Sequence, residues 1–206
     1  MDLQDKIINA IGNNNFCIGI FMDLSKAFDL VNHLILLSKL HYYGVRGIPH
    51  EWFKSYLSDR FQFTQYNNSS SDFASITHGV PQGSILGPLL FLIYINDLIL
   101  SSNKFEYIMY ADDTTLIYTQ PKLNYVEDNV NNELRCISNW FKANKLLLNL
   151  KKTNFCVFNN NCRDMSTLEN ISLAIDSIPI SKVNVVNFLG IQIDSDLKWD
   201  VHINNI

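Results

Sequence analysis

Residues 105–118 read FEYIMYADDTTLIY, and the predicted fold is built around them. Two β-prone segments lie on either side of Ala111-Asp112-Asp113, and strands separated by so short a polar stretch form a hairpin. The acidic pair is therefore expected at the tip of a tight turn. An isolated pair of aspartates is more often a turn feature than a functional site, so its meaning depends on what the rest of the chain places beside it.

A third aspartate has a similar setting far upstream. Residues 16–22 form an apolar, β-prone run that ends at Asp23. A sheet that includes both segments can bring Asp23 together with Asp112 and Asp113. Three carboxylates at the ends of apolar strands repel one another and are costly unless cations hold them. Divalent ions resolve both difficulties, and oxygen ligands suit Mg²⁺.

The remaining pattern mixes strands and helices without strict alternation, which is typical of one α+β domain. Ser25 is the expected N-cap of the first helix, Pro49 opens another, and a hairpin is expected around residues 61–77. We predict a small antiparallel sheet backed by helices at 31–41, 88–100 and 124–144, with further strands near 154–158, 171–175 and 184–193. No domain boundary is visible within residues 1–206.

The composition is that of an ordinary globular chain, 47% hydrophobic and 17% charged. The N-terminus carries acids where a secretory signal carries bases, and the apolar run 85–95 is too short to span a bilayer. We therefore expect an intracellular protein of the cytoplasm or nucleus, not secreted and without a membrane partner. The four cysteines lack zinc-site spacing and are expected to be reduced. A net charge of −4 argues mildly against a nucleic-acid partner.

Five segments in order resemble the palm motifs of reverse transcriptases from LINE-like, non-LTR retrotransposons, particularly the jockey type. They are FMDLSKAFD (21–29), GVPQGS with LGP (79–84 and 86–88), YADD (110–113), NKL through Asn149 to Lys152-Thr153 (144–153), and FLG (188–190). A chance match to one motif is easy, whereas five in order are not expected by chance. The resemblance covers nearly the whole chain and implies a right-hand polymerase palm that copies RNA into DNA.

The resemblance also implies site residues. Asp23, Asp112 and Asp113 would bind two Mg²⁺ ions, for which Mn²⁺ could substitute, with the Leu24 carbonyl as a further metal and nucleotide ligand. The partners would be an RNA template, a DNA primer and dNTPs. Phe28 would exclude a 2′-hydroxyl, since an apolar ring gives it neither space nor a hydrogen-bond partner.

Other implied site residues have simpler readings beside the functional ones. A core phenylalanine is the alternative for Phe28. Gln82 and Gly83 would pack against the nascent base pair, or else form a structural turn. Lys152 would assist the departing pyrophosphate, or else be a solvated lysine next to Lys151. Asp29 lies early in a helix, where a structural role is at least as expected as a catalytic one.

Basic fingers upstream of the first motif and a thumb downstream of the last are expected in this family and are not found here. We therefore expect a palm fragment of a longer polyprotein, whose fingers and thumb segments would be its partners. Loss of two basic regions would also account for the acidic balance. Two alternatives stay open: a catalytically inactive remnant that only binds nucleic acid or protein, and an RNA-directed RNA polymerase. Ala111 and Phe28 disfavour the latter.

Overall fold

The computed structural model describes residues 2–121, 124–158 and 171–205. By their contacts these residues form two compact units, and each is described by itself. Unit 1 comprises Met1–Ser25, Ile99–Phe141 and Leu148–Ile206, whereas unit 2 comprises Lys26–Leu98 and Lys142–Leu147. The expectation that residues 1–206 act as one domain stays a prediction.

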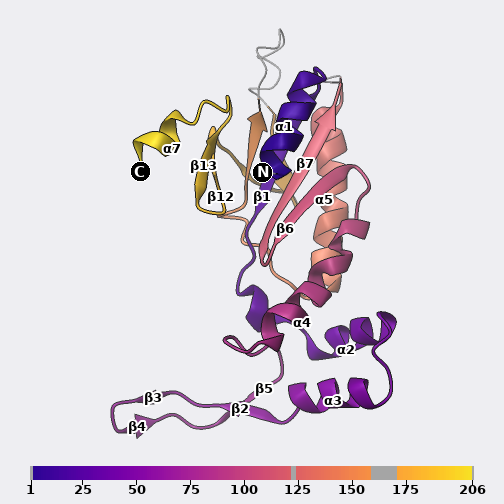
Figure 1. The fold of residues 1–206 in the computed structure, drawn as a ribbon, viewed down its shortest axis with the longest axis vertical. Coiled ribbons are helices and arrows are strands. Elements are labelled where there is room, and N and C mark those ends of the chain that lie inside the picture. The colour runs from indigo at the N-terminus through magenta and orange to yellow at the C-terminus, as the bar shows by residue number, and fades with distance from the viewer. Residues whose placement is uncertain (1, 122–123, 159–170, 206) are drawn as a thin grey trace. The chain divides into compact units, whose positions relative to one another are not determined.

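Unit 1 is built on a five-stranded sheet in the order β11-β8-β1-β7-β6 (Figure 1). Every neighbouring pair is antiparallel except β8 and β11. The central strand β1 has an almost entirely apolar sequence because it is covered on both faces. The strands are β1 (Phe16–Met22), β6 (Phe105–Tyr110), β7 (Asp113–Gln120), β8 (Asn154–Phe158) and β11 (Ser181–Lys182).

Helices and a hairpin cover the two faces of this sheet. On one face, α1 (Asp2–Gly12) and the hairpin of β12 (Val185–Phe188) and β13 (Ile191–Asp194) share a core with side chains of the sheet. Helix α5 (Val126–Ala143) lies along the sheet and buries its apolar stripe (Figure 1). The buried side chains of the first face are Leu3, Ile7, Ala10, Cys17, Phe21, Ile117, Cys156, Phe158, Val186, Phe188 and Ile193.

Close packing explains the one glycine of β1. A Cβ atom on Gly19 would lie 2.8 Å from the ring of Phe158 and 3.0 Å from that of Phe21, so only glycine leaves room for both rings. Two small elements complete unit 1: the pair β9 (Ala174–Ile175) and β10 (Ile178–Pro179), and the short helix α7 (Asp200–Asn204).

Unit 2 consists mainly of helices with one long hairpin. The helical elements are η1 (Ala27–Leu30), α2 (His33–Tyr42), α3 (Ile48–Leu57) and α4 (Leu86–Ile95), which is followed by η2 (Asn96–Leu100). The hairpin pairs β2 (Arg60–Gln62) with β5 (Ala74–Ile76), and β3 (Gln65–Tyr66) with β4 (Ser69–Ser70) nearer its tip. Its aromatic side chains Phe61, Phe63, Tyr66 and Phe73 are exposed.

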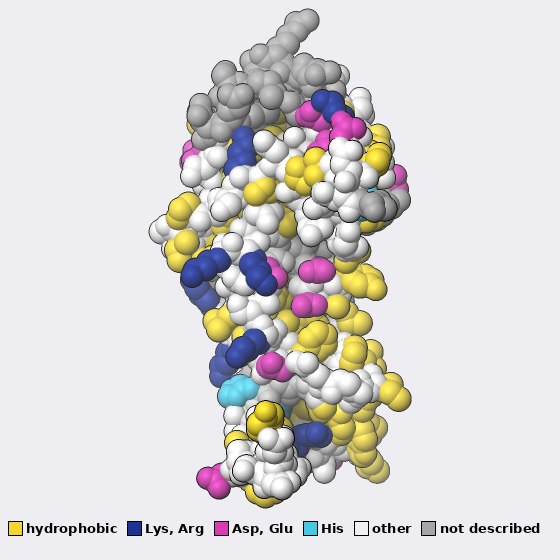
Figure 2. Space-filling view, turned by 90° about the vertical axis from the view of Figure 1, so that its left-hand side faces the viewer, with side chains coloured by type: hydrophobic (Ala, Val, Ile, Leu, Met, Phe, Trp, Pro, Cys, Tyr) yellow, Lys and Arg dark blue, Asp and Glu magenta, His cyan; other side chains and the backbone are white. Residues whose placement is uncertain are grey.

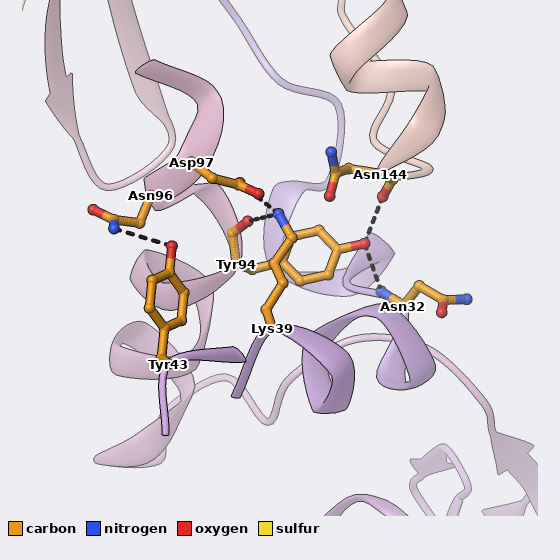
Figure 3. A network of polar contacts seen from close by, with 7 residues as sticks. All are labelled: Asn32, Lys39, Tyr43, Tyr94, Asn96, Asp97 and Asn144. Atoms are coloured by element: carbon orange, nitrogen blue, oxygen red, sulfur yellow. Dashed lines mark hydrogen bonds and ion pairs between the residues drawn. The ribbon is translucent and has the colours of Figure 1, made fainter. Parts of the chain in front are cut away.

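A buried tyrosine joins three segments of unit 2 (Figure 3). The hydroxyl of Tyr94 on α4 donates to the carbonyl of Asn144 and accepts from the backbone N–H of Asn32. Lys39 on α2 donates to the carbonyl of Tyr94 and to the carboxylate of Asp97, each at 2.6 Å. These bonds satisfy the polar groups that packing removes from water.

Most predicted elements are confirmed, with two corrections. Ser25 does not cap the first helix: the 3₁₀ turn η1 intervenes, and the side chain of Asn32 caps α2 by accepting from the N–H of Ile35. The run 184–193 is a hairpin of two strands.

The sheet is mainly antiparallel as predicted, and α5 matches the predicted helix 124–144 except at its first residues. The helices predicted at 31–41 and 88–100 form as α2 and α4, but both belong to unit 2. Cys17, Cys136 and Cys156 are free thiols, while Cys162 lies outside the described residues. No helix in the described part of the chain is long and apolar enough to cross a membrane.

Candidate active site

Asp23 follows the last residue of β1 and is fixed by its backbone. Its N–H donates to the buried hydroxyl of Thr153 at 3.3 Å, and its carbonyl accepts from the N–H of Asn149 at 2.8 Å. Leu24 next to it forms an isolated bridge with Leu148. The ladder bond at this bridge therefore uses the carbonyl of Asp23 and not that of Leu24. The segment 148–153, part of the fourth motif, thus holds the first motif in place.

Asp112 and Asp113 lie where the sequence places them, at the turn between β6 and β7. Tyr110 pairs with Asp113, so the turn consists of Ala111 and Asp112 alone. Met22 pairs with Thr114 in the neighbouring strand, so the next position along each strand sets Asp23 opposite Asp113. Residues that face each other across an antiparallel pair point to the same side. The register therefore brings the first and third motifs together.

The electrostatics of Asp113 reflect this crowding. Partial burial raises the pKa of its carboxyl above the ordinary value, and the negative charges of Asp112 and Asp23 raise it further. In the described part of the chain, no Lys, Arg or His forms a salt bridge with any of these three aspartates. Among the described residues, their charges are therefore not compensated by ion pairs.

Uncompensated carboxylates of this kind have the donor chemistry of a hard divalent cation site. No group of three His, Cys, Asp or Glu side chains among the described residues is arranged closely enough to hold a metal ion as it stands. The donor set fits such an ion in its chemistry, because oxygen ligands and excess negative charge are present, and bound cations would relieve the repulsion.

Unit 2 places Phe28, Gln82 and Gly83. Phe28 in η1 is half-buried, and its ring lies 4.7 Å from that of Phe91, centroid to centroid. Gln82 and Gly83 are exposed in the loop before α4. The side-chain amide of Gln82 donates to the carboxylate of Asp29 at 2.8 Å. Asp29 thus positions the second motif, a role that its place early in a helix did not reveal.

Backbone contacts fix the same loop against η1. The N–H groups of Gly79 and Val80 donate to the carbonyls of Val31 and Phe28, at 2.8 Å and 2.9 Å. Gly79 has φ of +87°, and a Cβ atom there would lie 3.0 Å from the backbone of Asp29. Only glycine accepts both the dihedral angle and the close approach. Gly79 of the second motif is therefore required for close backbone packing against η1.

Lys152 and the fifth motif complete the candidate residues. Lys152 is exposed in the turn before β8, and its backbone N–H bonds to the carbonyl of Asn149. No ion pair of Lys152 occurs among the described residues. In the fifth motif, Phe188 packs in the core of unit 1, while Leu189 and Gly190 form the turn of the β12–β13 hairpin with φ of +50° and +81°. Sequence reasoning missed the anchoring role of Thr153, whose only signal was its place in the fourth motif.

Comparison with known proteins bears on this arrangement. The family model described as "Reverse transcriptase (RNA-dependent DNA polymerase)" matches residues 3–193. The chain belongs to the reverse transcriptase family. This confirms the resemblance drawn from the five motifs.

Its relatives include reverse transcriptases of mobile elements. The "Probable RNA-directed DNA polymerase from transposon BS" of Drosophila melanogaster is 30% identical over 216 residues, which cover 98% of this chain and 22% of that protein. The "RNA-directed DNA polymerase from mobile element jockey" of the same organism is 25% identical over 209 residues, covering 97% and 22%. This reverse transcriptase chain therefore spans about a fifth of the length of these curated relatives.

Solved structures show the fold. A telomerase from Candida tropicalis, solved in complex with a fragment of telomeric RNA, superimposes with a TM-score of 0.62 at 14% identity, covering 97% of this chain and 32% of the telomerase chain. The telomerase from Candida albicans gives 0.57 at 16% identity, with coverage of 95% and 34%. The prediction of an α+β polymerase palm is thereby confirmed for this reverse transcriptase.

Proposed function

We propose that the chain is the palm of an RNA-directed DNA polymerase, which adds deoxynucleotides to the 3′-hydroxyl of a DNA primer on an RNA template. One observation carries the proposal: Met22 of β1 pairs with Thr114 of β7, which leaves Asp23 and Asp113 at the next position along each strand, with Asp112 in the adjoining turn. Family membership and the names of the relatives support the same reaction.

Asp23, Asp112 and Asp113 would hold divalent ions, with the Leu24 carbonyl as a further ligand. Mg²⁺ is the ion we propose, in two copies, and Mn²⁺ could replace it. When bound, such a pair of ions activates the attacking hydroxyl and stabilises the leaving oxygen of an in-line displacement. The chain itself contributes uncompensated negative charge at this point and a backbone anchored through Thr153 and Asn149.

The remaining roles belong to single side chains. Phe28 would exclude a 2′-hydroxyl by its ring, which rests against Phe91 and so resists displacement. Gln82 and Gly83 would pack against the nascent base pair, with Gln82 oriented by its bond to Asp29. Lys152 would protonate the departing pyrophosphate or stabilise its negative charge. The fingers and thumb of a longer polyprotein, acting in the cytoplasm or nucleus, would complete the grip on the template and primer.

Primer extension tests the proposal. The purified chain is given a DNA primer on an RNA template with dNTPs and Mg²⁺, beside an Asp112→Asn variant. We expect incorporation that the substitution lowers by a factor on the order of 10³ or more, because a neutral amide no longer offers a charged ligand. Asp72→Asn, in the exposed β2–β5 hairpin, removes the same charge elsewhere and should leave incorporation unchanged.

A second arm tests the sugar selectivity. Phe28→Ala should increase incorporation of ribonucleotides relative to deoxynucleotides, since it opens space for the 2′-hydroxyl. Incorporation of ribonucleotides and deoxynucleotides at equal rates by the unaltered chain would contradict the role of Phe28. The absence of any incorporation, even with related fingers and thumb segments supplied, would contradict the polymerase proposal and favour an inactive remnant.

A further inference from the structure

One face of the long hairpin in unit 2 carries three phenylalanines. Gln62 pairs with Ala74, so the next positions along the two strands set Phe63 opposite Phe73. The two rings lie 5.0 Å apart, centroid to centroid. Because side chains alternate between the faces of a strand, Phe61 points to the same side as Phe63. We call these three rings the phenylalanine row.

The phenylalanine row faces solvent. The exposed fraction of the side chain is 61% for Phe61, 48% for Phe63 and 71% for Phe73. The hairpin extends away from the helices of its unit (Figure 1), and Figure 2, which views it toward its tip, shows hydrophobic side chains at its surface. Two strands alone cannot bury rings on one of their faces, and exposed apolar surface of this kind marks a binding site.

A bulge separates the phenylalanine row from the tip of the hairpin. Between the pairs Gln62–Ala74 and Gln65–Ser70, the first strand has two residues and the second strand has three. An extra residue of this kind bends a ribbon and strengthens its twist. Tyr66, near the tip, lies an odd number of residues after the phenylalanines of the first strand, so the alternation of side chains assigns it to the opposite face.

Uncharged hydrogen-bonding side chains surround the row. Residues 61–77 include four serines, two threonines, two asparagines and two glutamines, and Asp72 is their only charged residue. An apolar partner would bury these polar groups without hydrogen bonds, which is costly. Unpaired bases suit them better, because amides and hydroxyls pair with base edges and a ring stacks on any base. Unit 2 has seven Lys and Arg against five Asp and Glu residues, a balance that attracts a polyanion.

The spacing of the rings fits stacked bases. Side chains two residues apart on a strand are separated by roughly 6.8 Å, which is twice the rise per residue. Successive nucleotides of a stacked strand are about 3.4 Å apart. The interval between Phe61 and Phe63 can therefore admit one base with a ring on each side. Phe73, across from Phe63, offers a further ring to a neighbouring base.

We propose that the phenylalanine row binds unpaired bases of single-stranded RNA by stacking. The inference rests on the proposed function for the choice of RNA, since a polymerase that copies RNA must hold template nucleotides that are not yet paired. The row belongs to none of the five motifs. It is therefore a site for the strand and not for the reacting nucleotide.

Equilibrium binding tests the proposal on the purified chain. Fluorescence anisotropy measures its affinity for a labelled single-stranded oligouridylate of about twelve nucleotides at several salt concentrations. Phe63→Leu and Phe73→Leu should each weaken binding roughly fivefold or more, because each removes a ring on which a base stacks. The dependence of affinity on salt should stay the same, since neither substitution removes a charge.

Matched variants separate stacking from folding and from general apolar contact. Phe73→Tyr keeps the ring and should bind like the unaltered chain, although leucine at the same position does not. Tyr66→Leu removes a ring that is 78% exposed on the opposite face and should change nothing. An RNA duplex of the same length, whose bases are already stacked on one another, should show no dependence on Phe63 or Phe73.

Three results would overturn the proposal. The first is that Phe63→Leu and Phe73→Leu bind the oligonucleotide like the unaltered chain, or that the unaltered chain does not bind it. The second is that Phe73→Tyr loses as much affinity as Phe73→Leu. The third is that the leucine variants leave RNA affinity unchanged but dissociate a dimer in size-exclusion chromatography with light scattering, which would assign the row to contact with a second copy.

Failure of this site and failure of the polymerase reaction give different results. Asp112→Asn lies in unit 1 and should retain both the affinity for the oligonucleotide and its loss on Phe63→Leu. A chain that shows this loss but extends no primer contradicts the polymerase proposal alone. A chain that extends primers while Phe63→Leu and Phe73→Leu leave its RNA affinity unchanged contradicts the role of the phenylalanine row alone.

Discussion

The two units of the molecule differ in charge as much as in fold. Unit 1, which carries the three aspartates, has fifteen Asp and Glu residues against nine Lys and Arg, a net charge of −6. Unit 2 has five acidic residues against seven basic ones, a net charge of +2. The net charge of −4 for the whole chain conceals this difference between the units. The net charge of the whole chain is therefore a weak argument against binding of nucleic acid.

The units also differ in how they hold their candidate residues. In unit 1, many backbone hydrogen bonds between β1 and β7 together fix the positions of Asp23, which follows β1, and Asp113, which begins β7. In unit 2 a loop is held on a 3₁₀ turn by a few separate contacts. We therefore expect single substitutions to disturb the unit 2 positions more than those of unit 1, and four measurements test this difference.

The largest effect is expected at Gly79. Gly79→Ala forces a Cβ atom to 3.0 Å from the backbone of Asp29 in a left-handed conformation, and we expect a loss of about 2 to 4 kcal/mol in the free energy of unfolding by urea. Gly44→Ala is the matched control, because its φ of +94° is similar but nothing lies within 4 Å. Equal losses at the two positions would show that the dihedral angle alone matters.

The next largest effect is expected at Tyr94. Tyr94→Phe removes a fully buried hydroxyl and leaves the carbonyl of Asn144 and the N–H of Asn32 without that partner. The expected loss is about 1 to 3 kcal/mol in the same urea measurement. Tyr42→Phe removes a hydroxyl from a side chain that is 84% exposed and should change nothing measurable. If Tyr94→Phe leaves the free energy of unfolding unchanged, packing alone holds together the segments that contain Asn32, Tyr94 and Asn144.

A smaller effect of opposite sign is expected in unit 1. The folded chain raises the pKa of Asp113 above its ordinary value of 3.8, so its ionised form costs stability at any pH above the raised value. Without added metal, Asp113→Asn should raise the thermal midpoint at neutral pH by about 1 to 3 °C, a modest gain because solvent screens exposed charges.

That gain has a defined pH dependence. It should shrink as the pH falls through the raised pKa and vanish below 3.8, where the carboxyl is protonated in both folded and unfolded chains. Asp59→Asn, in unit 2 and outside the carboxylate group, serves as the control. A stability gain at Asp113 that persists unchanged at low pH would show that charge repulsion is not its cause.

The smallest effect is expected at the bond between Gln82 and Asp29. Both side chains are exposed, so Gln82→Ala should cost only about 0.5 kcal/mol in the free energy of unfolding. A double-mutant cycle with Asp29→Asn isolates the pair, and a coupling energy indistinguishable from zero would remove Asp29 from its positioning role.

Sequence reasoning succeeded where a regular period or a contiguous motif carried the information. Alternation around Ala111-Asp112-Asp113 predicted the β6–β7 hairpin, and apolar spacing predicted α5 to within a few residues. The turn between Val185–Phe188 and Ile191–Asp194 was missed because a tight turn of Leu189 and Gly190 hardly interrupts an apolar run. The prediction of Ser25 as the cap of the first helix was wrong because nothing in the sequence marks the 3₁₀ turn that precedes α2.

Part of the candidate site could be predicted because its residues lie in contiguous motifs. The five motifs identified the candidate residues, and the register of β1 and β7 explains why Asp23 and Asp113 come at neighbouring ends of paired strands. The bond between Gln82 and Asp29 could not be predicted, because it depends on how a glycine-rich loop folds back over a distant turn.

The turn residue Ala111 has a consequence for how sharply the acidic pair is presented. Its φ of +54° is a conformation that costs an alanine roughly 1 to 2 kcal/mol and a glycine almost nothing. A glycine at this position would also sample many other backbone angles, and the two carboxylates would swing with it. The methyl group of Ala111 restricts the backbone angles that the turn can adopt. The turn is therefore less stable than one with glycine, but it fixes the direction of the Asp112 and Asp113 carboxylates more closely.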